Sequence, residues 1–269
     1  MKAENDSNLK ITLLGTGTSQ GVPIIGCDCE VCHSDDFRDK RLRVSILVQY
    51  KNTTVVVDTG PDFRQQMLRA GVKNLDAVLI THEHNDHIIG LDDVRPFNFM
   101  NHTDMPVYAV ERVQKELRER FDYIFKENPY PGAPMIKQIP ITKNEKIEVG
   151  DLEVIPIEVI HGQLPVIGFR FGDFTYLTDV KTISEKEIKK VSDSKILVLN
   201  ALHHNVHHSH LNLTEALELI EKLQPEKTYL THISHRMGLY ESVSKDLPSN
   251  VELAYDGLEL SLPFSDSPA

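Results

Sequence analysis

Short apolar runs between turn-forming residues dominate the first third of the chain and predict β-strands. The expected strands are Lys10–Leu14, Val44–Tyr50, Thr54–Asp58 and Asp76–Thr81. Lys51–Thr53 suits a hairpin turn between the second and the third of them. After the third strand, Pro61 suits the first position of a helix that runs to about Ala70, and Gly71 is the expected stop signal.

The rest of the chain continues the alternation of strands and helices. Helices are predicted at about Ala109–Lys126, Ser184–Val191 and Leu213–Leu223, the last with Asn212 as N-cap and Glu215 three positions on. A Pro/Gly-rich break, residues 128–134, follows the first helix. Further strands are predicted at Met135–Ile141, Lys146–Val149, Leu152–Ile160, Val166–Phe171, Phe174–Thr178, Lys195–Asn200, Lys227–Thr231, Val251–Ala254 and Leu258–Leu262.

Strands followed by helices, repeated in two similar halves, predict two mixed β-sheets packed face to face with helices outside, an αββα sandwich. The chain has 269 residues, and no low-complexity segment, internal sequence repeat or long linker divides it. We therefore expect a single domain over residues 1–269.

Composition and charge narrow the partners. The formal net charge of −11 disfavours nucleic acid, because phosphates would be repelled and no Lys/Arg run forms a basic patch. No run of about 20 apolar residues suggests a membrane span, and the N-terminus lacks the apolar core of a signal peptide, so a cytoplasmic location is expected. A second copy of the chain, in a homodimer, stays open as a partner.

Three of the thirteen histidines lie in the segment Thr81–His87, THEHNDH, directly after an apolar strand. His82 and His84 can point the same way, and Asp86 and His87 can face a neighbouring point. Imidazoles and a carboxylate suit zinc, manganese or iron. A lone His-x-His is more often solvated, but four such side chains after one buried strand predict a metal site.

The segment resembles the T-H-x-H-x-D-H signature of the metallo-β-lactamase superfamily at every position. Three later residues extend the resemblance, each at the end of a predicted strand: His161, Asp179 and His232. The resemblance implies that His82, His84 and His161 hold one divalent ion, that Asp86, His87 and His232 hold a second, and that Asp179 bridges both. Asp58 also matches a superfamily position. It either orients a ligand histidine or only forms a turn before Thr59-Gly60.

All three cysteines, Cys27, Cys29 and Cys32, lie within six residues, which suits one zinc ion that needs a fourth ligand. The stretch GTGTSQGVPIIGCDCEVC resembles the N-terminus of the phosphoribosyl cyclic phosphodiesterase family of phosphonate degradation. That resemblance implies a structural zinc completed by His235 of the segment Thr231–His235, THISH. It is weakest between about Met100 and Lys146, a region that we expect to shape the substrate pocket. The loop GTGTSQG lacks the features of a phosphate-binding loop, and its glycines are better explained by backbone conformation and close approach to the metal site.

Two divalent ions can share a hydroxide, because they lower the pKa of its parent water toward about 7. That hydroxide can attack phosphorus or a carbonyl carbon, and a leaving alkoxide then needs a proton. By resemblance, His210 is the candidate general acid, with His203, His204, His207 and His208 as competing neighbours. Asp86 is counted with the catalytic residues as a ligand of the second ion. Arg95 either contacts a substrate phosphate or pairs with Asp92 or Asp93.

The expected function is a metal-dependent phosphodiesterase that hydrolyses a small or cyclic phosphodiester with two zinc or manganese ions, beside one structural zinc. A bridging aspartate at position 179 favours this class over a β-lactamase, whose corresponding ligand is usually a cysteine. Two alternatives stay open. One is a ribonuclease Z-like nuclease, and the other is a carrier resembling the pyrroloquinoline quinone biosynthesis B proteins.

Overall fold

The N-terminal half of the chain forms a seven-stranded sheet that also takes in the last strand. The computed structural model describes residues 8–264. The strand order is β15-β1-β2-β3-β4-β5-β6. The members are β1 (Asn8–Gly15), β2 (Ser45–Tyr50), β3 (Thr53–Val57), β4 (Ala77–Leu79), β5 (Met105–Val110), β6 (Ile136–Ile141) and β15 (Glu259–Pro263). Strands β1 to β3 are antiparallel, whereas β3 to β6 run parallel.

The C-terminal half forms an eight-stranded sheet on the same plan. Its order is β11-β8-β9-β10-β12-β13-β14, and β7 pairs with β8 off this path. The members are β7 (Ile147–Val149), β8 (Leu152–His161), β9 (Leu164–Phe171), β10 (Phe174–Leu177), β11 (Thr182–Ile183), β12 (Ile196–Asn200), β13 (Lys227–Thr231) and β14 (Val251–Leu253). Again an antiparallel trio, β8 to β10, is followed by parallel strands, β10 to β14. Each half thus brings the carboxyl ends of several strands to one edge.

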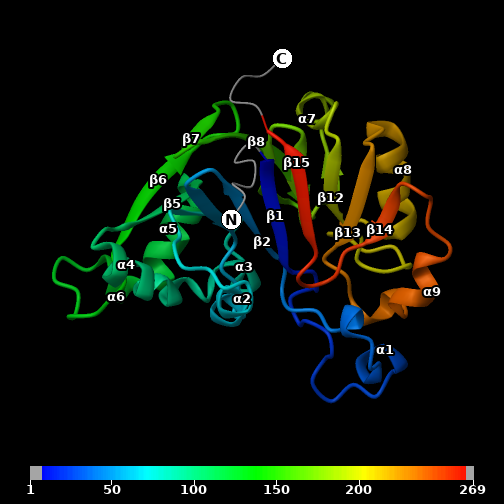
Figure 1. The fold of residues 1–269 in the computed structure, drawn as a ribbon, viewed down its shortest axis with the longest axis horizontal. Coiled ribbons are helices and arrows are strands. Elements are labelled where there is room, and N and C mark those ends of the chain that lie inside the picture. The colour runs from blue at the N-terminus through cyan, green and yellow to red at the C-terminus, as the bar shows by residue number, and fades with distance from the viewer. Residues whose placement is uncertain (1–7, 265–269) are drawn as a thin grey trace, which may run out of the picture.

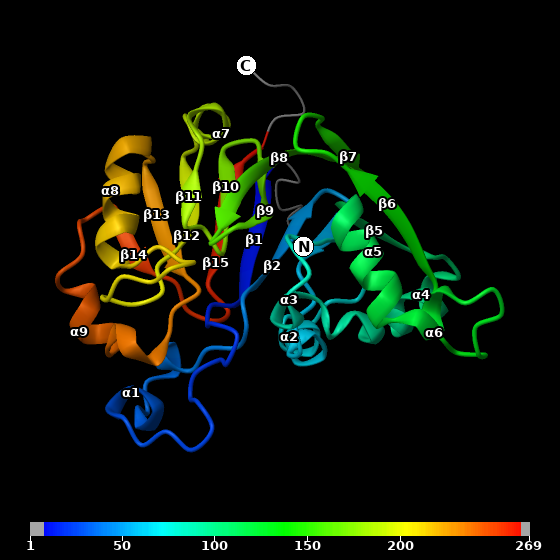
Figure 2. The ribbon, with the colours of Figure 1, turned by 180° about the vertical axis from the view of Figure 1, so that it is seen from behind.

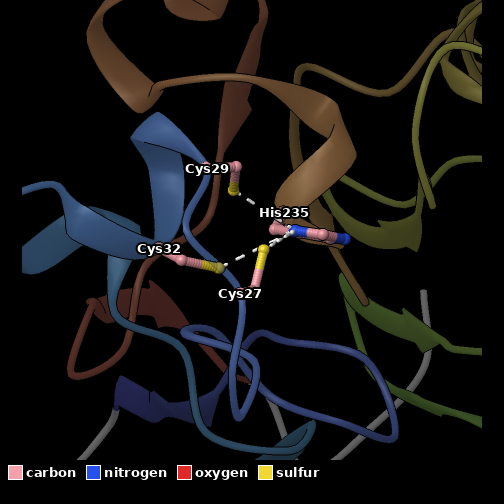
Figure 3. Close-up of side chains that lie close together, drawn as sticks. All are labelled: Cys27, Cys29, Cys32 and His235. Carbon is pink, nitrogen blue, oxygen red and sulfur yellow. Dashed lines mark hydrogen bonds between the residues drawn. The ribbon is translucent and has the colours of Figure 1, made fainter.

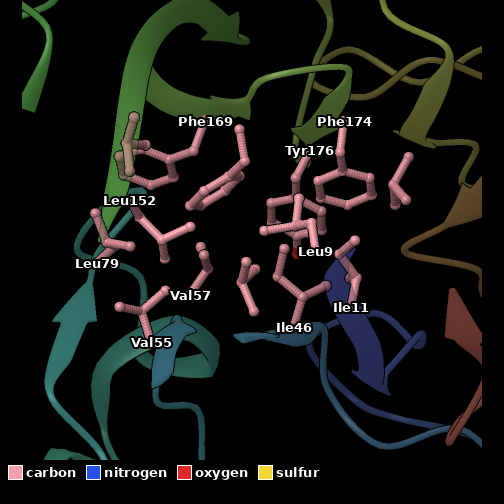
Figure 4. Packing of buried hydrophobic residues seen from close by; sticks show 14 of the residues in the cluster. Leu9, Ile11, Ile46, Val55, Val57, Leu79, Leu152, Phe169, Phe174 and Tyr176 are labelled. Atoms are coloured by element: carbon pink, nitrogen blue, oxygen red, sulfur yellow. The ribbon is translucent and has the colours of Figure 1, made fainter. Parts of the chain in front are cut away.

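The two sheets pack face to face over a shared apolar core (Figure 4). The first sheet contributes side chains such as Leu9, Ile46 and Val57, and the second contributes the aromatic rings of Phe169 and Tyr176. These side chains are fully or almost fully buried. Burial of this apolar surface is the main force that holds the sheets together.

Helices cover the outer face of each sheet, as Figures 1 and 2 show. On the first sheet lie α2 (Phe63–Arg69), α4 (Arg95–Asn101), α5 (Glu111–Arg120) and α6 (Asp122–Phe125). On the second lie α7 (Glu185–Val191), α8 (Leu213–Leu223) and α9 (Tyr240–Ser244). The remaining short helical turns are α1 (Glu30–His33), α3 (Asn85–Ile88), η1 (Phe37–Asp39), η2 (Leu91–Val94) and η3 (His235–Met237). The predicted αββα sandwich is confirmed.

The helix expected over Ala109–Lys126 is wrong at its start and too long. The preceding segment Met105–Val110 is strand β5, which alternates buried and partly exposed side chains and lies between β4 and β6. The helix begins only at Glu111, and the turn at Phe121 separates it from α6. Sequence reasoning missed β5 because its pairing partners lie far away along the chain.

Helix α8 begins and ends as expected. The Asn212 side chain accepts a hydrogen bond from the Glu215 backbone N–H, and the Glu215 carboxylate accepts one from the Asn212 N–H. Such a capping box is a local device, so sequence alone can locate it. Within residues 8–264, no helix combines the length and apolar composition that a bilayer span requires.

Candidate metal centre

The predicted ligands gather where strand ends from both sheets meet. The segment Thr81–His87 follows β4, and Asp58 follows β3 directly. From the second sheet, His161 is the last residue of β8, and Asp179 and His232 come just after β10 and β13. All seven residues predicted for the dinuclear site belong to groups of three side chains. Within each group, the ligand atoms lie within 4.8 Å of one another.

Three acidic or imidazole residues of this region have left-handed backbone, which non-glycine residues seldom adopt. The φ angles are 66° at Asp58, 59° at Asp179 and 54° at His232. Each such residue costs on the order of 1–3 kcal/mol, and this strain is typical of functional sites. The sharp turns occur directly after strands and aim the three side chains at the shared edge.

His82, His84 and His161 form the first group. Nε2 of His82 lies 3.0 Å from Nδ1 of His84. The Thr81 hydroxyl lies 3.0 Å from Nδ1 of His82, and the Ser209 carbonyl lies 2.8 Å from Nδ1 of His161. Because a carbonyl only accepts, Nδ1 of His161 carries the hydrogen and Nε2 keeps its lone pair for a ligand bond.

Asp86, His87 and His232 form the second group, in which Nε2 of His87 lies 3.4 Å from Oδ2 of Asp86. On its other side, His87 donates from Nδ1 to Oδ2 of Asp58 over 2.7 Å. Asp58 is completely buried, and it also accepts from the backbone N–H of Thr81. Of the two roles open for Asp58, the orienting contact to a histidine is present in the structure.

Asp179 lies between the two groups. One carboxylate oxygen, Oδ2, is 3.3 Å from Nε2 of His87 and accepts from the Thr178 hydroxyl. The other oxygen, Oδ1, is 3.3 Å from Nε2 of His232 and 3.8 Å from Nε2 of His161. A single carboxylate therefore faces histidines of both groups, as a bridging ligand must.

Burial and charge act together in this cluster. Burial opposes a positive charge on His87, but the carboxylates of Asp86, Asp58 and Asp179 outweigh it and raise the pKa of His87 well above its usual value. For Asp179, burial opposes ionisation, yet the surrounding imidazoles, first His232 and then His87, hold its pKa well below the usual range. Burial lowers the pKa of His82 well below normal. Ionised carboxylates amid imidazoles are ready ligands for cations.

The cluster also contains buried ring nitrogens without hydrogen bonds. Among the described residues, Nε2 of His87, Nδ1 of His210 and both ring nitrogens of His232 have none. Buried polar atoms normally find a partner, because an unpaired one costs free energy. Together with the donor set of five imidazoles and two carboxylates, these atoms fit divalent metal ions such as zinc or manganese.

His210 adjoins both groups. Its ring is stacked 4.7 Å from the His232 ring and lies 4.4 Å from the His161 ring, measured between centroids. Nδ1 of His210 is 3.6 Å from Oδ1 of Asp179, and His161, Asp179 and His210 form a further group of ligand atoms. Burial, followed by the electrostatic interaction with the neighbouring His232 ring, lowers the pKa of His210 to about 2, so the His210 ring is neutral at pH 7.

Arg95 is held by a carboxylate outside the cluster. Its Nη2 lies 2.7 Å from Oδ2 of Asp92, and the Tyr123 hydroxyl donates to the other oxygen of the same carboxylate. Of the two roles considered from the sequence, the ion pair with Asp92 is therefore the one that the structure contains.

The three cysteines converge on His235, which comes from the far end of the chain (Figure 3). Nδ1 of His235 lies 3.3 Å from the Sγ atoms of Cys27 and Cys29 and 3.7 Å from Sγ of Cys32. Zinc bonds of about 2.3 Å to sulfur and 2.0–2.1 Å to nitrogen place such atoms roughly 3.5 Å apart at a tetrahedral angle. The backbone N–H of Cys32 lowers the pKa of Cys29 to about 6, whereas burial raises that of Cys32 to about 11.

Some residues that shape the site had no predicted role. The Thr81 hydroxyl donates to Asp58 and lies beside His82, so it links an orienting carboxylate to a candidate ligand. Glu83, inside the histidine segment, pairs with Arg112 of α5. The threonine of the T-H-x-H pattern was the available signal for Thr81. Neither the Arg112 contact nor the Ser209 carbonyl leaves a signal in sequence.

The loop of residues 15–21 approaches the metal region through backbone contacts. The Thr16 carbonyl accepts a hydrogen bond from the N–H of Ile233, next to His232. A Cβ atom on Gly15 would lie 1.9 Å from the Arg43 carbonyl oxygen, and one on Gly17 would lie 2.9 Å from the Arg41 side chain. Close packing of backbone explains these glycines.

Comparison with known proteins shows which family has this arrangement. The family model described as the beta-lactamase superfamily domain matches residues 53–233, which include all seven residues predicted for the dinuclear site but neither the cysteines nor His235. A solved diphosphatase of the PhnP family is 42% identical, with a TM-score of 0.90, and the match covers 96% of this chain and 98% of that one.

Two curated relatives are longer than the matched region. An octanoyltransferase of Porphyromonas gingivalis is 40% identical over 253 residues, which cover 93% of this chain and 51% of that protein. A ribonuclease Z of Methanopyrus kandleri is 25% identical over 133 residues, 48% of this chain and 44% of that protein. The chain thus spans about half the length of these relatives.

Proposed function

Because the chain belongs to the metallo-β-lactamase superfamily of hydrolases, we propose that it is a metal-dependent phosphodiesterase that cleaves a small phosphate diester. The observation that carries the proposal is Asp179, whose two oxygens face histidines of two separate groups. The similarity to a PhnP-family diphosphatase over nearly the whole of both chains supports attack at phosphorus. A cyclic diester and a diphosphate diester share that reacting centre.

The seven clustered residues would hold two divalent ions. His82, His84 and His161 would bind one ion, Asp86, His87 and His232 the other, and Asp179 both. Bound there, zinc or manganese would supply an activated water and positive charge on the phosphate oxygens. Cys27, Cys29, Cys32 and His235 would hold a third ion, zinc, with a structural role.

The protein side chains orient these ligands and handle the proton. Asp58 and the Ser209 carbonyl fix the rings of His87 and His161 through their Nδ1 hydrogens. His210 lies beside the cluster and would protonate the leaving oxygen. Its ring is neutral in the free protein, and the negative charge of a bound phosphate favours the protonated form.

A ribonuclease Z-like activity is the second candidate, supported by the similarity to that enzyme. The net charge of −11 disfavours it, because a long polyanion must approach many carboxylates. Octanoyl transfer is the activity in the name of one relative, and that protein is about twice as long as the region that matches this chain. The His/Asp cluster of this chain suits hydrolysis with metal ions, so transfer is included only as an arm of the test.

The test is a turnover panel with protein reconstituted with zinc or with manganese. The substrates are bis(p-nitrophenyl) phosphate, a ribose cyclic phosphate, cyclic nucleotides, a dinucleoside diphosphate, precursor tRNA and an octanoyl ester. We expect turnover of at least one small phosphodiester or diphosphate, and its loss in Asp86→Ala. Cleavage of tRNA alone would favour the nuclease. Binding without any turnover, with both metals loaded, would favour a carrier and overturn the proposal.

A further inference from the structure

A row of imidazole rings leads away from the metal cluster along the loop of residues 201–212. The distance between ring centroids is 4.7 Å from His232 to His210, 5.1 Å from His210 to His207, and 6.1 Å from His207 to His203. His203 is buried and His207 half-buried. The last two rings have no role in the proposed hydrolysis.

Backbone contacts fix the tautomers of both rings. Nδ1 of His203 accepts from the N–H of Asn205 over 3.2 Å, and Nδ1 of His207 accepts from the N–H of Ser209 over 3.3 Å. A backbone N–H can only donate, so each Nδ1 presents a lone pair. The hydrogen of each neutral ring therefore sits on Nε2, and both rings offer N–H donors.

A cation lies next to this row. The loop is tied to η3 by the hydrogen bond from the Ser234 N–H to the Leu202 carbonyl and by the contact of His204 Nε2 with the Met237 carbonyl, 2.8 Å. Arg236 lies in η3 between these two contacts to the loop, and after burial its charge is a further cause that lowers the pKa of His203. Within residues 8–264, Arg236 is exposed and makes no ion pair, whereas Lys181, near His207, is already paired with Glu215.

A third metal site is not supported here. Among the described residues, neither His203 nor His207 belongs to a group of three His, Cys, Asp or Glu ligand atoms within 4.8 Å. The row therefore combines two N–H donors and a guanidinium. This combination matches the oxygens of a phosphoryl group.

We propose that His203, His207 and Arg236 form a subsite for a second phosphoryl group of the substrate, one ring beyond His210. The subsite rests on the proposed function and narrows its substrate class to diphosphate diesters, in which a non-reacting phosphoryl group adjoins the reacting one. His203 and His207 donate from Nε2, and Arg236 supplies the charge. They act as positioning residues that select the substrate.

The experiment compares two non-hydrolysed ligands of the metal-loaded protein, methylenediphosphonate and orthophosphate, by calorimetry. We expect the native protein to bind methylenediphosphonate at least tenfold more tightly. His207→Leu and Arg236→Gln should each weaken the binding of methylenediphosphonate roughly tenfold, because a hydrogen bond or a charge on its second phosphoryl group is lost. The binding of orthophosphate, which has no second phosphoryl group, should weaken much less. His207→Gln, which keeps an N–H donor, should restore most of the preference.

Arg64→Gln is the matched control for Arg236→Gln, since Arg64 is exposed on α2, away from this loop. Metal content and thermal unfolding of each variant verify that it is folded and loaded, and Arg236→Gln, at an exposed position, provides a second route if His207→Leu does not fold. Equal weakening of both ligands, or no preference in the native protein, would overturn the subsite. Turnover of bis(p-nitrophenyl) phosphate without a diphosphonate preference rejects the subsite alone. A preference without any turnover rejects the proposed function alone.

Discussion

The carboxylate of Asp58 lies 2.7 Å from Nδ1 of His87, and neither side chain has exposed surface. This hydrogen bond holds the ring of His87 so that Nε2 faces Asp86 and Asp179. Partners that orient a metal-binding histidine matter almost as much as the ligand itself.

Asp58→Ala should therefore lower the affinity for the second metal ion by about 10- to 100-fold. The physical reason is that His87 loses the acceptor that fixes its tautomer. Competition with a zinc chelator measures the affinity. Asp104→Ala, at an exposed aspartate, is the control. Unchanged affinity in Asp58→Ala would reduce Asp58 to a turn-forming residue.

We expect up to three metal ions per chain, two in the His/Asp cluster and one in the cysteine cluster. Elemental analysis of the reconstituted protein tests this number. Asp86→Ala should remove one ion and Cys29→Ser a different one, because the clusters share no ligand. A content that never exceeds one ion per chain after reconstitution contradicts the dinuclear site.

Cys29→Ser should reduce thermal stability more than it reduces turnover by molecules that remain folded. The binding energy of a structural zinc contributes directly to folding, and the apolar cluster around the cysteines is small. Thermal unfolding and zinc content are the measurements, with Asp28→Ser, at the exposed neighbouring position, as control. Full stability with retained zinc would show that this cluster is not a structural zinc site.

His210→Ala should lower turnover of a substrate with an alkoxide leaving group by about 10²- to 10⁴-fold, the usual contribution of a general acid. Turnover of bis(p-nitrophenyl) phosphate should fall far less, because p-nitrophenolate leaves without a proton. Steady-state rates on both substrates provide the comparison.

In this comparison metal content should stay unchanged, and Asp86→Ala should impair both substrates. Equal losses in His210→Ala with metals retained would make His210 a positioning residue, and His207 and His208 would be examined next. Loss of a metal ion would instead assign His210 to the ligands, in keeping with its closeness to Asp179.

Phe169→Ala should destabilise the protein by about 3–5 kcal/mol, the typical cost of removing a buried aromatic ring. Phe169 is fully buried between the two sheets. Urea unfolding measures the loss. Phe99→Ala is matched to it, since Phe99 is 53% exposed and should cost little. Similar losses for both would contradict a core shared by the sheets.

Local signals made part of the fold predictable. Helix α8 could be bounded because its capping box lies within four residues, and the strand before His82 could be recognised from one apolar run. Strand β5 was missed, since only its neighbours β4 and β6, remote in sequence, make Met105–Val110 extended. Because the residues near Glu111 favour a helix, the predicted helix began two residues too early, at Ala109 instead of Glu111.

By itself, the sequence determined which residue types stand at which strand ends: the histidines and aspartates of THEHNDH, then His161, Asp179 and His232 in order. It also places the three cysteines within six residues, which is close enough for them to bind one ion. Only the tertiary structure decided which atoms meet. It joined Asp58 to His87, paired Arg95 with Asp92, and set His203 and His207 as N–H donors beside Arg236. Such contacts depend on distances and tautomers between segments remote along the chain, and a one-dimensional pattern does not encode them.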